Sequence, residues 1–121
     1  MAIPKNVQSQ VVDHPLISVL SGEETRLIMN QLDYKALRAG DTLFKEGDSG
    51  TQCYLIIYGA IVVTKRLESG HEQILATIGS GELLGQIALI DRKPRSATCK
   101  ASADGVGLVL LDSDIFERLY S

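Results

Sequence analysis

The chain has 121 residues, which is enough for one domain with its own hydrophobic core. Its residues are 45% hydrophobic and 22% charged, a balance typical of a globular protein rather than a disordered or fibrous one. The net charge of -3 and the scattered basic residues argue against direct binding of nucleic acid, which favours a basic face.

No apolar stretch approaches the roughly 18 residues that a membrane-spanning helix requires. The first residues also lack the apolar core of a signal peptide. We therefore expect a cytoplasmic protein that does not bind a membrane by itself.

The N-terminal third predicts helices. The first 13 residues are polar and show no clear period, so we expect a flexible arm over 1–13 and one domain over 14–121. The segment His14–Leu20 has a proline near its start and apolar residues at helical spacing, which predicts one short helical turn. Ser21 can cap a longer helix after it, because Glu24 stands three residues later in the spacing of a capping box.

From residue 34 onward, glycines separate short runs of β-branched or alternating apolar residues. This spacing indicates an antiparallel sandwich or barrel made of hairpins. Tyr58-Gly59-Ala60 is typical of a tight turn between two strands. The runs that predict strands are Ala36–Ala39, Thr42–Lys45, Gln52–Tyr58, Ala60–Leu67, Glu72–Ile78, Ser96–Ala101 and Val106–Leu111.

The last residues predict a second helix. Asp112, Ser113 and Asp114 offer a cap, and the apolar residues in Ile115–Tyr120 continue the pattern. A helix of barely two turns is marginal unless it docks against something. We therefore expect this helix to be truncated or to be completed by a partner.

The two cysteines and two histidines do not form a metal-binding pattern. Cys53 and Cys99 each lie inside an apolar run, and neither belongs to a CxxC pair. A disulfide between them is one alternative, but we expect reduced thiols buried in the core of a cytosolic protein. With His14 and His71 they offer too few ligands for a metal site, so we expect no metal and no cofactor.

The stretch from Gly85 to Ala97 has the pattern of an anion site. A glycine opens a short apolar run, Ile87–Ile90, and a charged turn and Pro94 lead to Arg95. The free N–H groups of one helical turn would supply one side of such a site, and a guanidinium would supply the other.

This arrangement resembles the cyclic-nucleotide-binding domain of catabolite activator proteins, kinase regulatory subunits and nucleotide-gated channels. The resemblance covers about Leu16 to Tyr120 and is most specific in the phosphate-binding cassette, here Gly85-Gln86-Ile87-Ala88-Leu89 followed by Pro94-Arg95-Ser96-Ala97. Two upstream segments also resemble the family, Leu43-Phe44-Lys45-Glu46-Gly47-Asp48 and Tyr54-Leu55-Ile56-Ile57-Tyr58-Gly59.

The resemblance implies a fold and a set of site residues. The fold is an eight-stranded antiparallel jelly-roll-like β-barrel, a cupin-like double-stranded β-helix, with an N-terminal helix and a short C-terminal helix. The residues that it implies for ligand binding are Gly85, Gln86, Ile87, Ala88, Arg95 and Ser96, and those for the base pocket are Val63, Leu75 and Ile78.

One residue departs from the family pattern. The family most often has Glu after the cassette glycine, where it accepts the ribose 2′-hydroxyl, and this chain has Gln86. An amide carbonyl accepts a weaker bond than a carboxylate does, by about 1 kcal/mol. In return, Gln removes a negative charge close to the anionic phosphate, so we expect binding to be weakened or retuned.

The resemblance implies a regulatory module without catalytic residues. It would bind cAMP or cGMP and transmit occupancy through its C-terminal helix to an effector domain or protein. The alternative is a degenerate domain that mediates protein interaction or homodimerisation without nucleotide. A cupin-type enzyme would need several His and Glu ligands at close spacing, which this chain does not supply.

Overall fold

The computed structural model describes residues 1–120, except for the side chains of Ile87 and Tyr120. Within these residues one six-stranded antiparallel sheet has the strand order β1-β6-β3-β4, with β2 paired to β6 and β5 paired to β3. The elements are α1 (Lys5–Val12), α2 (Pro15–Ser18), α3 (Gly22–Gln31), β1 (Asp33–Leu37), β2 (Thr42–Phe44), β3 (Gln52–Arg66), β4 (Glu72–Gly79), β5 (Leu83–Leu84), α4 (Gln86–Asp91), β6 (Thr98–Asp112) and α5 (Ser113–Tyr120).

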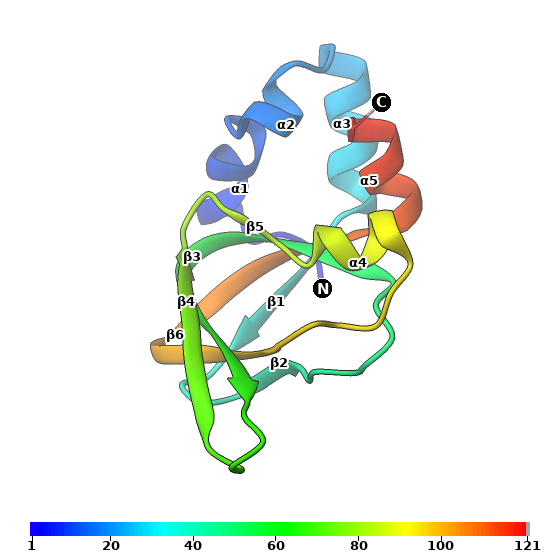
Figure 1. Cartoon of the computed structure of the whole chain (residues 1–121). Helices are drawn as coiled ribbons and strands as arrows, with labels where there is room; N and C mark the ends of the chain where they lie inside the picture. The colour runs from blue at the N-terminus through cyan, green and yellow to red at the C-terminus, as the bar shows by residue number, and fades with distance from the viewer. Residues whose placement is uncertain (121) are drawn as a thin grey trace.

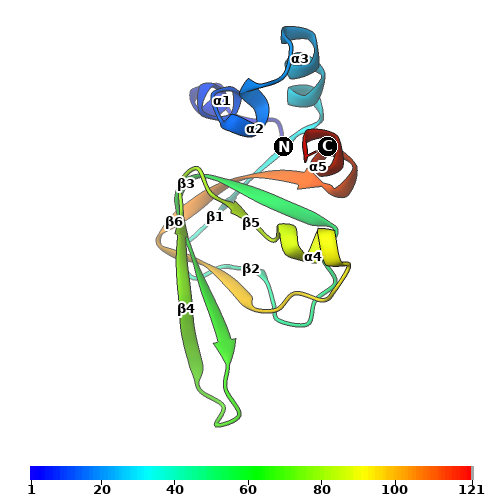
Figure 2. The ribbon, with the colours of Figure 1, turned by 45° about the horizontal axis from the view of Figure 1, so that its top comes forward.

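The helices fall into two groups. Helices α1, α2, α3 and α5 gather at one end of the curled sheet, and α4 lies below α5 and beside β3 (Figures 1 and 2). No helix in the described part of the chain is long and apolar enough to cross a bilayer.

Strands β3 and β6 form the centre of the sheet, because they pair with each other along most of their length. Each has 15 residues, and the register runs from Gln52 opposite Asp112 to Thr64 opposite Thr98. Alternate residues of a strand point to opposite faces. Strand β3 therefore contributes Cys53, Leu55 and Ile57 to the core under the helices and the residues between them to a second core inside the curled sheet.

The turn predicted at Tyr58-Gly59-Ala60 is wrong, because β3 continues through these residues. Gly59 has φ +75° and Gly105, in the neighbouring strand β6, has φ +74°. The register of the β3–β6 pair shifts on both sides of Gly59. The two glycines therefore produce a bulged bend in a pair of strands instead of reversing one strand.

The number of strands differs from the prediction for the same reason. The segments Gln52–Tyr58 and Ala60–Leu67 merge into β3, and Ser96–Ala101 and Val106–Leu111 merge into β6. Strand β5 has no counterpart among the predicted segments. The mainly antiparallel β fold with flanking helices is confirmed, but the described residues form six strands in a sheet that is not closed, rather than an eight-stranded barrel.

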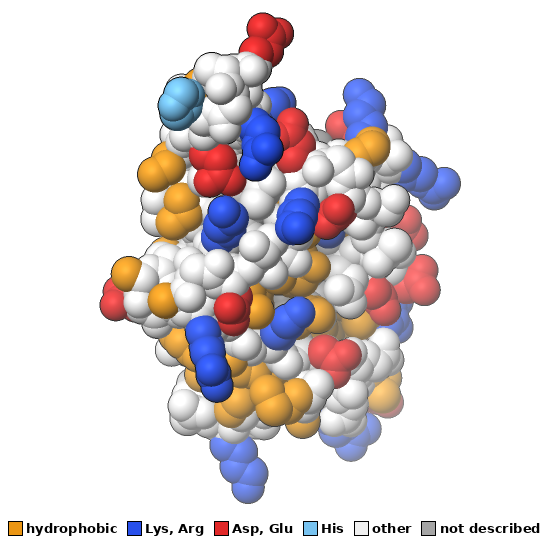
Figure 3. Space-filling model, turned by 90° about the horizontal axis from the view of Figure 1, so that it is seen from below, with side chains coloured by type: hydrophobic (Ala, Val, Ile, Leu, Met, Phe, Trp, Pro, Cys, Tyr) orange, Lys and Arg blue, Asp and Glu red, His pale blue; other side chains and the backbone are white. Residues whose placement is uncertain are grey.

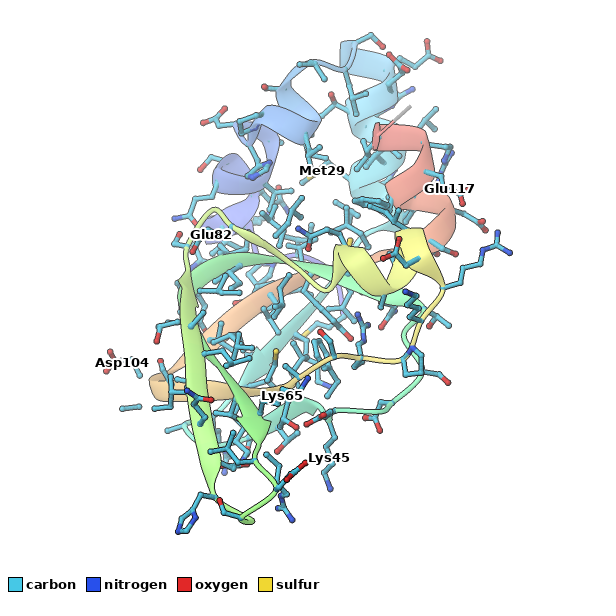
Figure 4. All side chains as sticks on the ribbon, viewed as in Figure 1. Met29, Lys45, Lys65, Glu82, Asp104 and Glu117 are labelled. Carbon is cyan, nitrogen blue, oxygen red and sulfur yellow. The ribbon has the colours of Figure 1, made fainter. Side chains whose placement is uncertain are left out.

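Residues 1–13 do not form the loose arm that the sequence analysis expects. Lys5–Val12 forms α1, and Ile3, Val7 and Val11 are buried in the core under the helices. Val7 and Val11 are spaced by four, so they fall on one face of α1 despite their polar neighbours, and Ile3 joins the same core just before the helix begins. Figure 4 shows this layer between the helices and the sheet, where Met29 of α3 also lies.

The other predicted helix starts are confirmed. The capping box of α3 has both bonds, from the Glu24 N–H to Ser21 Oγ at 3.2 Å and from the Ser21 N–H to Glu24 Oε1 at 3.1 Å. Helix α2 begins at Pro15 as expected. Asp112 caps α5 by accepting a bond from the Ile115 N–H at 2.8 Å. These bonds satisfy N–H groups that a helix start otherwise leaves free.

Replacing Gly59 by alanine tests the bend. A Cβ at this position would lie 2.1 Å from the Gly105 carbonyl oxygen, and φ would stay positive. We expect Gly59→Ala to lower the free energy of unfolding by about 3 kcal/mol, because backbone strain and overpacking act together.

Gly70→Ala is the matched control, because Gly70 has φ +90° but no atom within 4 Å of its Cβ position. It should cost about 1 kcal/mol, the strain alone. Urea denaturation measures both variants, and equal losses would show that the close contact at the bend does not exist.

Candidate functional site

The cassette is fixed to the sheet at its start. Strand β5 pairs with Tyr54 and Leu55 of β3, and Gly85 follows directly as the N-cap of α4. Gly85 has φ +86°, a left-handed conformation that glycine adopts without strain. Helix α4 then runs for six residues and ends at Arg92, which has φ +55°. The sequence thus folds into the short helical turn that the analysis predicts.

Arg95 points into the protein instead of into solvent. Its residue is 5% exposed. Nη1 donates to the Gly85 carbonyl oxygen at 2.9 Å, and Nη2 donates to the Gln52 carbonyl oxygen at 2.5 Å. The guanidinium carbon lies 4.2 Å from the ring centre of Phe44, within the range of a cation–π contact. The positive charge is therefore held in one place by the cassette, by β3 and by β2.

The charge of Arg95 has no carboxylate partner within the part of the chain that the structure describes. Its Nε–H is buried and makes no hydrogen bond there. A buried charge is costly unless an opposite charge and hydrogen bonds compensate it. The two carbonyls compensate only part of that cost, so the site is suited to an anion.

Two glycines make room for this guanidinium. A Cβ on Gly50 would lie 2.4 Å from Arg95 Cζ, and a Cβ on Gly85 would lie 2.6 Å from Nη1. Any side chain at either position would displace the charged group. Gly85 can be predicted from the sequence pattern. Gly50, the Phe44 ring and the Gln52 carbonyl cannot, because their roles depend on packing between distant segments.

A pocket of about 330 Å³ opens beside Arg95. It brings together most of the residues that the sequence analysis selects, from both the cassette and the expected base pocket. Figure 3, which views the molecule from below, shows hydrophobic side chains gathered near the middle of the lower face with basic side chains among them. The pocket is lined by Phe44, Val63, Ala76, Ile78, Leu83, Leu84, Gly85, Gln86, Ala88, Lys93, Pro94, Arg95, Ser96, Ala97 and Cys99.

Leu75 is not one of the lining residues, contrary to expectation, and it is 51% exposed. The β3–β4 register shifts here, since Val63 faces Ala76 and Thr64 faces Ile74. Leu75 is the extra residue of this bulge, so Ala76 lines the pocket in its place. For Ile87, the backbone lies in the first turn of α4, and its side chain is outside the described residues.

Both cysteines are free and buried, as predicted. Burial raises the pKa of the Cys53 thiol and of the Cys99 thiol to about 11, and the nearby Arg95 charge opposes part of that rise. In the described residues, no group of three or more His, Cys, Asp and Glu side chains is placed to hold a metal ion.

A sequence model of the cyclic nucleotide-binding domain matches residues 34–121, which include the whole pocket. The chain belongs to the cyclic nucleotide-binding domain family. Its architecture fits the same assignment, because solved members of this family have the antiparallel sheet with flanking helices seen in Figure 1.

Three relatives show the range of this similarity. The chain is 33% identical over 100 residues to the cyclic AMP receptor protein of Thermus thermophilus, covering 83% of this chain and 46% of that protein. It is 35% identical over 107 residues to cGMP-dependent protein kinase, isozyme 1, of Drosophila melanogaster, covering 87% of this chain and 14% of the kinase. The cAMP co-crystal structure of the regulatory domain of Toxoplasma gondii PKA superposes with a TM-score of 0.74 and 26% identity over 86% of this chain and 39% of that one.

The chain therefore spans less than half of these proteins. Their names concern cyclic AMP in one case and cyclic GMP in another, so the comparisons do not separate the two nucleotides.

The thiols give a test of the buried site. At pH 8 a thiol with a pKa of about 11 is ionised in about one molecule per thousand, so Cys53 and Cys99 should resist iodoacetamide in the native protein. Mass spectrometry should find both alkylated in urea. As pH rises from 9 to 11, unfolded thiols ionise before native ones, and stability should fall. Rapid labelling of native protein at pH 8 would contradict the burial of these residues.

Proposed function

We propose that this domain is a non-catalytic regulatory module whose pocket binds a cyclic nucleotide, cAMP or cGMP. The observation that carries the proposal is the buried Arg95 guanidinium, which lines the pocket and has no carboxylate partner among the described residues. A cyclic phosphate supplies the missing negative charge. Membership of the family and the cAMP-bound structure of a relative support the same ligand class.

The phosphate binds at the start of α4. Gly85, Gln86 and Ala88 from this start line the pocket together with the guanidinium of Arg95. The backbone N–H groups of Ile87 and Ala88 are the donors that we assign to the phosphate, because an anion is favoured at a helix start. Charge-assisted bonds of this kind contribute about 1.5–3 kcal/mol each. Ser96 adds a hydroxyl at the same pocket, and Gln86 replaces the family's glutamate at the ribose.

The purine base occupies the apolar part of the pocket. Val63 faces Ala76 across the β3–β4 pair, Ile78 lies two residues further along β4, and Cys99 lines the same space. A pocket of about 330 Å³ lies at the small end of the range for small-molecule sites, which suits a single nucleotide. Apolar walls with a few fixed polar groups at one end are the usual arrangement in such sites.

Replacing Arg95 by alanine tests the phosphate assignment. Isothermal titration should give saturable binding of cAMP or cGMP to the native protein, and affinity should fall at least ten-fold in Arg95→Ala. Arg92→Asn is the matched control, because it removes an exposed charge outside this pocket and Asn tolerates the positive φ at that position. Its affinity should stay within about two-fold, since exposed charges are largely screened. Unchanged affinity in Arg95→Ala would refute the assignment.

Occupancy is transmitted from α4 to α5 through packing. Leu89 of α4 is partly buried against the core under the helices, and this core includes Ile115 and Phe116 of α5. A ligand that fixes α4 therefore biases the position of α5 through Leu89. We propose that an effector domain or a partner protein reads this change.

Hydrogen exchange tests this route. In the native protein, saturating nucleotide should slow amide exchange in α5 as well as in α4, because the two helices share one core. Leu89→Ala should keep affinity within about three-fold but lose the effect on α5. Ile90→Ala is the control, because Ile90 is the next residue and is 57% exposed. If both variants retain the effect on α5, Leu89 is not the route.

A second candidate function rests on β4, the edge strand of the main sheet. Ile74 is 67% exposed and Leu75 is 51% exposed, and exposed apolar patches can mark protein interaction sites. Together with Gln86, these side chains favour a nucleotide-independent interaction or dimerisation module. Thermal stability that no cyclic nucleotide changes, combined with a stable dimer in light scattering, would support this function over nucleotide binding.

A further inference from the structure

The side chains that line the pocket carry more positive charge than one cyclic nucleotide can neutralise. The lining residues include two cationic side chains, Lys93 and Arg95, and neither Asp nor Glu is among them. Gln86, the first residue of α4, is neutral and half-buried in the same lining. A cyclic phosphodiester carries one negative charge, so it leaves one of the two cations without a partner inside the pocket.

A phosphate monoester carries close to two negative charges at pH 7 and above, because its second ionisation lies near pH 6. We propose that this pocket also accepts nucleotides with a dianionic phosphate monoester, the class of the nucleoside 5′-monophosphates. We assign to Gln86 the role of admitting them. This inference rests on the nucleotide-binding function proposed above, and it adds a second ligand class to the same site.

Gln86 sets this selectivity through charge. It directly follows Gly85, whose carbonyl accepts the Nη1 bond of Arg95, so residue 86 is next to the fixed guanidinium. A carboxylate at this position would repel the second negative charge of a monoester. The repulsion between like charges a few ångströms apart is strong wherever water is partly excluded. An amide removes that repulsion and can itself donate a bond to a phosphate oxygen.

Lys93 supplies the second positive charge. Its residue is exposed, but it lines the pocket two positions before Arg95. An exposed ammonium is screened by salt, so its contribution is smaller than that of the buried guanidinium and depends on ionic strength. The two cations are therefore expected to act unequally, with Arg95 required for both ligand classes and Lys93 favouring the dianion.

The experiment compares four probes, cAMP, cGMP, AMP and GMP, by isothermal titration at pH 7.5 and low salt. In the native protein, the monophosphate of the preferred base should bind within about ten-fold of its cyclic form. Gln86→Glu should tighten the cyclic nucleotide modestly and weaken the monophosphate, so the ratio of the two dissociation constants rises at least ten-fold. Lys93→Gln should raise the same ratio about two- to five-fold.

Lys45→Gln is the control for the loss of a lysine charge. Lys45 is exposed, does not line the pocket, and points away from the rest of the protein in Figure 4. In Lys45→Gln, the ratio of the dissociation constants for the monophosphate and its cyclic form should equal that of the native protein. A carboxylate in the first turn of a helix is compatible with folding, so Gln86→Glu should retain the native circular dichroism spectrum.

The outcomes separate this inference from the proposed function. If cyclic nucleotides bind and monophosphates bind more than 100-fold more weakly, the inference is overturned and the proposed function stands. If monophosphates bind and cyclic nucleotides do not, the inference is supported and the proposed function is refuted. A Gln86→Glu variant whose ratio is unchanged would overturn the role of Gln86, and folded protein that binds none of the four probes would overturn both.

Discussion

The site depends on one buried positive charge. The Arg95 guanidinium lies against the Phe44 ring and donates to two carbonyl oxygens, yet no carboxylate in the described residues neutralises it. Gly50 and Gly85 provide the space that it occupies. Burial of an uncompensated charge costs stability, and an anion that binds beside it recovers that cost. The protein thus holds a cation in place before any ligand arrives, which limits the reorganisation that binding requires.

The rest of the fold positions that charge. Strand β3 separates two cores, with alternate side chains facing the helices or the second core inside the curled sheet. At the paired bend of Gly59 and Gly105 the register jumps from Gly59–Val106 to Ile61–Ala101, so β3 and β6 curl there and pair again beyond it. Helix α4 lies at the edge of the pocket and also packs against the core under the helices through Leu89. The pocket and the helix layer therefore share structural elements, as the proposed regulatory role requires.

Sequence reasoning succeeds where the signal is local. The capping box of Ser21 and Glu24 and the glycine that starts α4 depend only on neighbouring residues, and the structure contains both. Prediction from the sequence fails where the strand register or the packing of distant segments determines the local structure. The bend at Gly59 has the sequence of a turn, and only pairing with β6 shows that the strand continues.

The base pocket and the N-terminus show the same limit. The resemblance implies Leu75 for the base pocket, but the bulge opposite Val63 gives that place to Ala76. Helix α1 escapes notice because only two residues, Val7 and Val11, mark its buried face, and their burial depends on a core built from much later strands.

The measurement that tests the central claim most directly is the ¹H–¹⁵N NMR signal of the Arg95 Nε–H, assigned by its absence in Arg95→Lys. This group has no partner in the ligand-free protein, so its signal should shift progressively and saturate as cAMP or cGMP is added. An Arg95 signal that stays unchanged while backbone signals of the pocket shift to saturation would show that the nucleotide binds without this charge.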